Sequence, residues 1–167
     1  MKKFCLVAFA MFVNILCFGQ SGGGANDFER VSLEGISIEI PKDCELNEEL
    51  SQPDQGAFCC MTPDKSFVFF FMYFETGDDF SVTKRLNGEA QQLGWDLEEC
   101  LFYPVNISDD DEDTMPFWVA AFEGGGSAAT GVYHLDPDDH TGLYIYVQSA
   151  HDAFEQVLPC ILSVKKE

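Results

Sequence analysis

The stretch from Phe67 to Phe74, FVFFFMYF, constrains the fold more than any other part of this 167-residue chain. It follows Pro63-Asp64-Lys65, which has the composition of a turn. Side chains alternate between the two faces of a strand, so this segment is apolar on both faces. A strand of that kind lies inside a sheet that is covered on both sides. The chain is therefore expected to fold in layers around a sheet.

Several other segments have strand character. Ile36–Ile40 alternates apolar and polar residues and ends at Pro41, which indicates a strand with one buried face. The remaining strand-like segments lie between loops rich in Gly, Pro, Asp and Ser; they are Ala57–Thr62, Leu97–Val105, Pro116–Phe122, Thr130–Leu135 and Gly142–Ser149. Together these segments predict a sheet of about six strands.

Two segments have the period of an amphipathic helix. The first carries an apolar stripe at Val82, Leu86, Ala90 and Leu93. Asp79 or Ser81 can cap its start, and Gly94 can end it.

The second helix is expected from about His151, with a stripe made by Phe154, Val157, Leu158, Ile161 and Leu162. Pro159 predicts a kink or an early end before that residue. The expected fold class is therefore α+β, an antiparallel sheet of about six strands with helices on both faces, in the order β-β-β-α-β-β-β-α.

The charge of the chain is strongly asymmetric, with 29 Asp and Glu against 9 Lys and Arg and a net charge of -20. Nucleic acids are not expected as partners, because binding to phosphate requires clustered Lys and Arg. Anionic membrane surfaces are excluded on the same ground. Cationic partners and divalent metals remain open, and the acidity also favours solubility.

The N-terminus has the layout of a secretory signal peptide. Lys2 and Lys3 are followed by the apolar run Phe4–Phe18, and cleavage is expected near Gly19 or Gln20. The expected organisation is a signal peptide over residues 1–20, a mobile Gly-rich leader over 21–32 and one α+β domain over 33–167.

The signal peptide predicts a secreted or periplasmic protein, with no membrane insertion once the signal peptide is removed. Lipoprotein anchoring through Cys17 is the alternative, but lipid attachment needs a small residue before the cysteine, and Leu16 is not small.

Five cysteines remain after removal of the signal peptide, and export makes disulfides plausible among them. Cys59 and Cys60 are adjacent on an extended segment and point to opposite faces. We expect Cys44 to pair with Cys59 or Cys60, and a pair between Cys100 and Cys160 is also open. There is no Cys-x-x-Cys motif of a redox or zinc site.

The sequence offers weak signals for catalysis. It has no Gly-x-Ser-x-Gly motif, and its histidines (His134, His140 and His151) fall on a strand end, a loop and a helix start. No catalytic or cofactor-binding residue is therefore assigned. Calcium is the one metal considered, because Asp136, Asp138 and Asp139 place three carboxylates in one short loop.

Tyr144 and Tyr146 share one face of the last long strand. If no helix covers that face, they form an aromatic patch for a peptide or a sugar. If a helix covers it, they are core tyrosines.

The element order resembles the PsbP-like fold, a family of small exported α/β/α sandwich proteins. The residues that carry the resemblance are Gly35-Ile36-Ser37-Ile38-Glu39-Ile40-Pro41, the turn Met61-Thr62-Pro63-Asp64-Lys65 and the closing helix from His151 to Ser163. No Trp follows the Pro41 strand, and the chain is rich in cysteine, so it departs from the family at these points. The resemblance implies a non-enzymatic adaptor or assembly subunit.

The function expected from the sequence is an exported, non-enzymatic binding or assembly module with a protein or peptide partner. The alternatives are a small acidic hydrolase and a calcium-dependent surface binding protein. An enzyme would require a deep cleft with a carboxyl group of raised pKa, whereas a module would present a shallow face.

Overall fold

The computed structural model describes residues 28–33, 35–109, 113–136, 138, 140–150 and 153–167, without the side chains of 153–155. Its elements in chain order are β1 (Phe28–Leu33), β2 (Ile36–Pro41), β3 (Glu45–Leu46), the short 3-10 helix η1 (Pro53–Gln55), β4 (Ala57–Met61), β5 (Phe67–Glu75), α2 (Val82–Gln92), β6 (Leu101–Asn106), β7 (Thr114–Ala121), β8 (Ser127–Asp136), β9 (Thr141–Ser149), α3 (Ala153–Leu162) and β10 (Lys165–Lys166).

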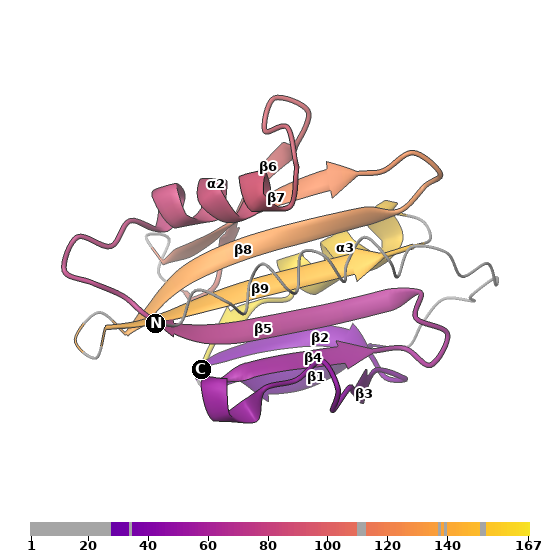
Figure 1. Ribbon diagram of the computed structural model, residues 1–167, viewed down its shortest axis with the longest axis horizontal. Helices are drawn as coiled ribbons and strands as arrows, with labels where there is room; N and C mark the ends of the chain where they lie inside the picture. Colours follow the sequence, from indigo (N-terminus) through magenta and orange to yellow (C-terminus); the bar gives the residue numbers. More distant parts are fainter. Residues whose placement is uncertain (1–27, 34, 110–112, 137, 139, 151–152) are drawn as a thin grey trace.

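The strands form two antiparallel sheets. The larger has seven strands in the order β3-β4-β5-β9-β8-β7-β6, and the smaller has three in the order β1-β2-β10. In Figure 1, α2 lies on one side of the larger sheet, while α3 and the β1–β2 hairpin lie on the other. The α+β class, the antiparallel pairing and the helices on both faces are thus as predicted.

The expected strand count of about six and the expected order are wrong. The described residues form ten strands, and four of them lie between α2 and α3. The expected order has three there, one fewer than the four strand-like segments of the sequence between residues 97 and 149. β3 and β10 have two residues each, which is too short for any alternation to be visible in the sequence.

β1 falls where the Gly-rich leader was expected to continue to residue 32. Its sequence FERVSL is half polar and does not alternate regularly, so it carries little strand signal. The structure nevertheless pairs it with β2 over its whole length. Arg30 supports this pairing, because its guanidinium bonds to Ser37 Oγ at 3.0 Å and to Glu39 Oε1 at 2.9 Å across the hairpin.

The larger sheet separates two apolar cores. We call the one beneath α3 and the smaller sheet the α3 core; it includes Ile38, Phe69, Phe117, Ile145 and Ile161. The one beneath α2 is the α2 core; it includes Cys59, Phe70, Leu86, Tyr144 and Tyr146.

β5 confirms the prediction made from its sequence. Phe67 and Phe69 enter the α3 core, whereas Val68 and Phe70 enter the α2 core. The strand lies inside the larger sheet between β4 and β9. An all-apolar strand is stable there because both of its faces are removed from water.

α2 also begins and ends as predicted. Ser81 is the N-cap, and its side chain accepts a hydrogen bond from the Lys84 backbone N–H at 3.4 Å. Leu86 and Ala90 are buried in the stripe. Gly94 follows the last turn with φ +80°, a conformation that favours glycine.

Of the kink or early end expected at Pro159, the early end is not observed. α3 contains Pro159 and continues to Leu162. Beyond the proline, Ser163 closes the helix, because its backbone N–H bonds to the Pro159 carbonyl at 3.1 Å and its hydroxyl donates to the Cys160 carbonyl at 2.6 Å. Leu162, expected in the apolar stripe, is 56% exposed, and Phe154 and His151 lie outside the side chains described.

Across the described residues, neither helix combines the length and the hydropathy that a membrane crossing requires.

Candidate functional site

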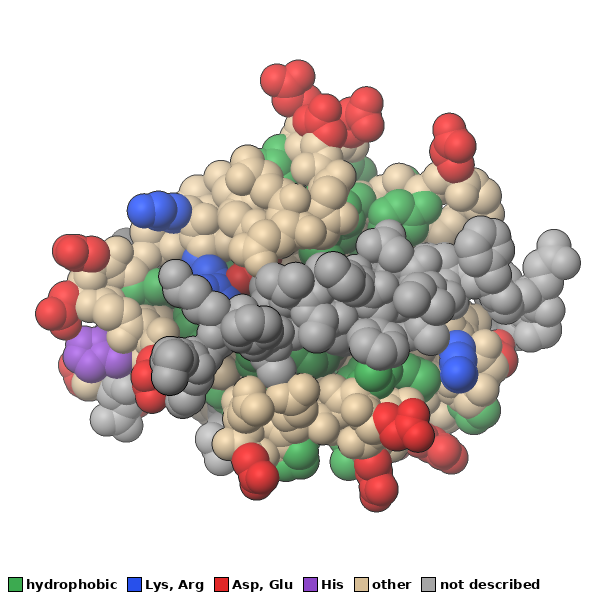
Figure 2. Space-filling view, viewed as in Figure 1, with side chains coloured by type: hydrophobic (Ala, Val, Ile, Leu, Met, Phe, Trp, Pro, Cys, Tyr) green, Lys and Arg blue, Asp and Glu red, His purple; other side chains and the backbone are tan. Residues whose placement is uncertain are grey.

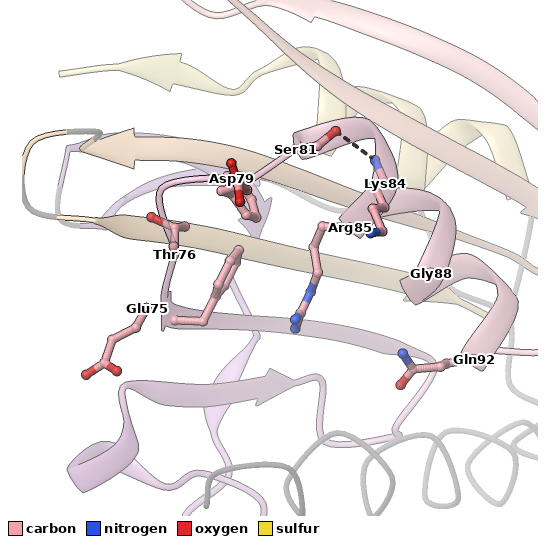
Figure 3. A pocket seen from close by; sticks show the side chains of 11 residues that line it. Glu75, Thr76, Asp79, Ser81, Lys84, Arg85, Gly88 and Gln92 are labelled. Atoms are coloured by element: carbon pink, nitrogen blue, oxygen red, sulfur yellow. Dashed lines mark hydrogen bonds between the residues drawn. The ribbon is translucent and has the colours of Figure 1, made fainter.

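A hollow of about 300 Å³ lies between the end of β5 and the first turns of α2. The residues around it come from three consecutive segments: the β5 end, the loop of residues 76–81 and one side of α2. Figure 3 shows Glu75, Thr76 and Asp79 on the strand and loop side, and Arg85, Gly88 and Gln92 on the helix side. The Ser81 cap positions the helix side, because it fixes where α2 starts.

Two aromatic rings make the apolar part of the hollow. Phe74 and Phe80 contact each other with ring centroids 5.6 Å apart. Phe80 also meets the ring of His134 edge-on at 4.9 Å, and His134 Nε2 lies 3.2 Å from the Thr76 hydroxyl. His134, which the sequence places at a strand end, therefore packs behind this aromatic pair.

A glycine in the neighbouring strand makes room for Phe74. The two residues are register partners in β5 and β9. A Cβ atom added at Gly142 would lie 2.3 Å from Cζ of the Phe74 ring. The ring can lie flat over β9 only because this position has no side chain.

An ion pair closes the inner side of the hollow. Arg85 Nε contacts Glu89 Oε1 one turn along α2, and the guanidinium carbon of Arg85 lies 4.7 Å from the centroid of the Phe74 ring. The Arg85 side chain is 37% exposed, whereas that of Glu89 is 1% exposed. Arg85 thus reaches the hollow, and Glu89 anchors it from within the α2 core.

Burial sets the electrostatics of Glu89. Removal from water raises the pKa of its carboxyl group, and the charge and hydrogen bond of Arg85 partly oppose that rise. No donor among the described residues lies within hydrogen-bonding distance of Glu89 Oε2. Burial also raises the pKa of Tyr144, and the negative charge of Glu89 adds to the shift. The hollow is therefore backed by a polar group inside an otherwise apolar core.

The rim of the hollow is charged. Glu75, Asp79 and Lys84 are exposed around it. Because Glu89 offsets the charge of Arg85, the rim has a slight excess of negative charge. On the face that Figure 2 shows, acidic side chains gather along the periphery and basic ones are few. The arrangement can bind an apolar side chain on the two phenylalanines and polar backbone groups at Arg85 and Gln92.

The calcium candidates lie elsewhere, in the loop between β8 and β9. Asp136 Oδ1 accepts a hydrogen bond from the Asp138 backbone N–H at 2.9 Å, and Asp138 is exposed. Asp139 lies outside the described residues. No group of three side chains with metal-binding geometry occurs within the part of the chain that is described. Calcium binding at this loop stays a prediction.

The five cysteines from Cys44 onward are free thiols in the structure. Cys59 enters the α2 core and Cys60 packs against the α3 core, so the predicted opposite orientation of these neighbours is confirmed. Cys44 and Cys160 also belong to the α3 core. The pairs expected from the sequence remain predictions.

Tyr144 and Tyr146 are each 1% exposed and belong to the α2 core. Of the two alternatives expected from the sequence, these residues are therefore core tyrosines beneath α2 and do not form an exposed aromatic patch. Tyr146 donates a hydrogen bond to Gln148 Oε1 at 2.9 Å, so its hydroxyl is satisfied inside the core.

The sequence did not single out Phe74, Phe80, Arg85 or Glu89 as site residues. A signal for the ion pair was present, because Glu89 lies between Leu86 and Leu93 on the apolar stripe and follows Arg85 by four residues. A charged residue inside a helical stripe faces a core, and it requires a partner there.

Comparison with known proteins gives similarity at the level of the fold. The solution structure of cyanobacterial PsbP (CyanoP) from Synechocystis sp. PCC 6803 is 12% identical with a TM-score of 0.49, over 90% of this chain and 99% of that one. The crystal structure of the Saccharomyces cerevisiae Ran-binding protein Mog1p is 11% identical with a TM-score of 0.45, over 74% of this chain and 77% of that one. No protein-family model and no curated protein matches the chain. The resemblance to the PsbP-like fold is confirmed, as a weak one.

Proposed function

We propose that the chain is an exported, non-enzymatic binding module, and that the hollow between β5 and α2 receives a segment of a protein or peptide partner. Export is supported by the basic start and the apolar run Phe4–Phe18. The observation that carries the proposed function is the hollow itself, where an apolar floor, a half-exposed guanidinium and a charged rim converge.

The hollow favours recognition over catalysis. An acid catalyst needs a carboxyl group that can reach a substrate. Glu89 has the raised pKa of such a group, but it is 1% exposed and its Oε1 contacts Arg85. The carboxylate thus serves to hold the guanidinium at the wall of the hollow.

The expected partner segment is basic and carries an apolar side chain. Its apolar side chain would lie on Phe74 and Phe80, and its backbone carbonyls would accept hydrogen bonds from Arg85. Its cations would face Glu75 and Asp79 on the rim. The net charge of -20 steers a basic partner toward the protein and repels an acidic one.

Capped hexapeptides test this function by fluorescence anisotropy. One pool carries Lys on both sides of a Phe or Leu pair, a second carries Glu in place of Lys, and a third carries Ser in place of the apolar pair. We expect binding of the first pool only, weakening as salt rises. Equal binding of all three pools, or of none, contradicts the proposal.

A matched pair of variants locates the site. The double change Glu75→Gln with Asp79→Asn removes two charges from the rim, and Glu98→Gln with Glu99→Gln removes two exposed charges elsewhere. The first variant should weaken binding by about tenfold and the second by less than twofold. Equal losses would show that only the net charge matters.

A further inference from the structure

The α3 core contains three cysteines, contributed by three segments of the chain. Cys44 precedes β3, Cys60 lies in β4 and Cys160 lies in α3, and all three pack in or against this core. Burial raises the pKa of the Cys44 thiol, and among the charged neighbours that raise it further, Cys60 has the largest effect, followed by Asp43, Cys59 and Glu29. Cys44 in turn raises the pKa of Cys160. Cys44, Cys60 and Cys160 thus pack in or against one core.

Cys44 directly precedes β3, and the register of β3 with β4 places it near Cys60. Leu46 is the register partner of Cys60, and Cys44 precedes Leu46 by two residues. Side chains two residues apart in extended chain share a face, and both thiols pack against the α3 core, so we take Cys44 as a diagonal neighbour of Cys60. Cys59 points to the opposite face, into the α2 core, so it is not available to Cys44.

We propose that Cys44 and Cys60 form a disulfide when the protein meets a disulfide oxidant, and that this bond fastens the edge strand β3 to β4.

The backbone near Cys44 can supply the movement that the bond requires. Diagonal neighbours lie about 7–8 Å apart, whereas the Cα atoms of a disulfide lie roughly 4.4–6.8 Å apart. β3 has two residues and is the outermost strand of its sheet. A shift of about 1–2 Å therefore disturbs few other contacts.

Exposure favours Cys60 over Cys160 as the partner. Cys44 and Cys60 are partly exposed, whereas Cys160 is fully buried. A dissolved oxidant can reach the first two thiols in the folded protein and not the third.

The chemistry is thiol–disulfide exchange. The Cys60 thiolate attacks one sulfur of oxidised glutathione, which forms a mixed disulfide and releases one glutathione thiolate. The Cys44 thiolate then attacks the Cys60 sulfur of the mixed disulfide and displaces the second glutathione thiolate. The two protons lost by the cysteines end on the two glutathione molecules. The protein loses two electrons, and the oxidant gains them.

Peptide mapping tests the proposal on the full chain with Cys5→Ser and Cys17→Ser, which removes the two thiols of the predicted signal peptide. The folded protein is incubated with oxidised glutathione, its remaining thiols are alkylated, and it is digested without reduction. A Glu-specific protease is required, because no Lys or Arg lies between Cys44 and Cys60, whereas Glu45, Glu48 and Glu49 do. We expect one major cross-linked species, joining the peptide of Cys44 to that of Cys59 and Cys60.

Two neighbouring substitutions identify the partner. Cys60→Ser should abolish this cross-link, and the matched control Cys59→Ser should retain it. Oxidation should also raise the Tm by roughly 5–10 °C in the Cys59→Ser protein and leave the Cys60→Ser protein unchanged. A cross-link from Cys44 to Cys160, a loss in Cys59→Ser alone, or glutathione adducts without any cross-link would each overturn the proposal. If either variant fails to fold, tandem mass spectrometry of the cross-linked peptide from the protein that retains both Cys59 and Cys60 shows which of the two is bonded to Cys44.

Discussion

The two faces of the larger sheet bury different kinds of side chain. Beneath α3 and the smaller sheet, the buried core residues that the structure describes include one tyrosine, Tyr133, but no charged side chain, and the packing is made by groups such as Ile38 and Phe69. Beneath α2, the carboxyl group of Glu89 and the hydroxyl groups of Tyr144 and Tyr146 are buried among the apolar groups. Buried polar groups stabilise a protein less than apolar ones but hold neighbouring groups in fixed positions. We therefore expect the α3 core to contribute more to stability, and the α2 core to hold Arg85 at the hollow.

The largest expected effect comes from truncating adjacent phenylalanines on opposite faces. Phe69→Ala should lower the free energy of unfolding by about 4 kcal/mol, because it empties a fully buried position in the α3 core. Phe70→Ala should cost about 3 kcal/mol, since this side chain lies in the more polar α2 core and is 5% exposed. Urea denaturation measures both. A larger loss for Phe70→Ala would reverse the assignment of the stabilising face.

Two glycines sharpen the same comparison. A Cβ at Gly131 would lie 2.4 Å from the ring of Phe117, which is fully buried, so Gly131→Ala should cost about 2–3 kcal/mol. Gly142→Ala should cost about 1 kcal/mol, because Phe74 is only half-buried and its ring can move. That movement would reshape the hollow.

Peptide binding separates the two variants further. Gly142→Ala should weaken binding of the basic apolar hexapeptides at least fivefold, and Gly131→Ala should leave the affinity of the folded fraction unchanged. Equal binding by both variants would exclude Phe74 from the contact surface.

The ion pair gives a third test. Arg85→Met leaves the buried Glu89 without its partner and should cost about 2 kcal/mol, less than a fully buried pair because Arg85 is 37% exposed. The double change Arg85→Met with Glu89→Leu should restore most of the lost stability. It should not restore peptide binding, since the guanidinium is still missing. A double variant as unstable as Arg85→Met would mean that burying the unpaired Glu89 carboxyl group does not destabilise the Arg85→Met protein.

The smallest expected effect is the pH dependence that Glu89 adds. Its pKa in the folded protein is raised above the ordinary value of 4.5, so the folded state holds this proton at a pH where the unfolded state has lost it. Stability from this group therefore falls as pH rises from about 4.5 through the raised pKa. Glu89→Gln should remove this fall, which thermal melts at pH 4 to 8 would show. The exposed control Glu98→Gln should keep the slope of the parent protein.

The sequence predicted those elements whose pattern is local. The alternation in Ile36–Ile40 and the all-apolar Phe67–Phe74 become β2 and β5, and the stripe with its Ser81 cap becomes α2. β10 could not be predicted, because its two residues become a strand only by pairing with Ser37 and Ile36.

The candidate site was not predicted from the sequence for a related reason. From the sequence alone, Phe74 and Phe80 look like ordinary core or loop aromatics. In the fold, Gly142 of β9 leaves room for the Phe74 ring, and His134 of β8 packs against Phe80. Arg85 and Glu89 are i,i+4 partners on α2, and the place of Glu89 on the apolar stripe was the one signal that it faces a core. The packing of α2 on the sheet shows that Glu89 is buried and that Arg85 reaches the hollow.

The pairing of β10 with β2 also determines when the fold can be completed. β2 occupies the middle of the smaller sheet, and one of its two neighbours is made of the last residues of the chain. Glu167 bonds through its backbone N–H to the Gly35 carbonyl and through its side chain to Ser32. During synthesis these contacts are missing until residues 165–167 have been translated. A nascent chain that has not yet reached residue 165 therefore lacks the strand that completes the smaller sheet beside its N-terminal hairpin.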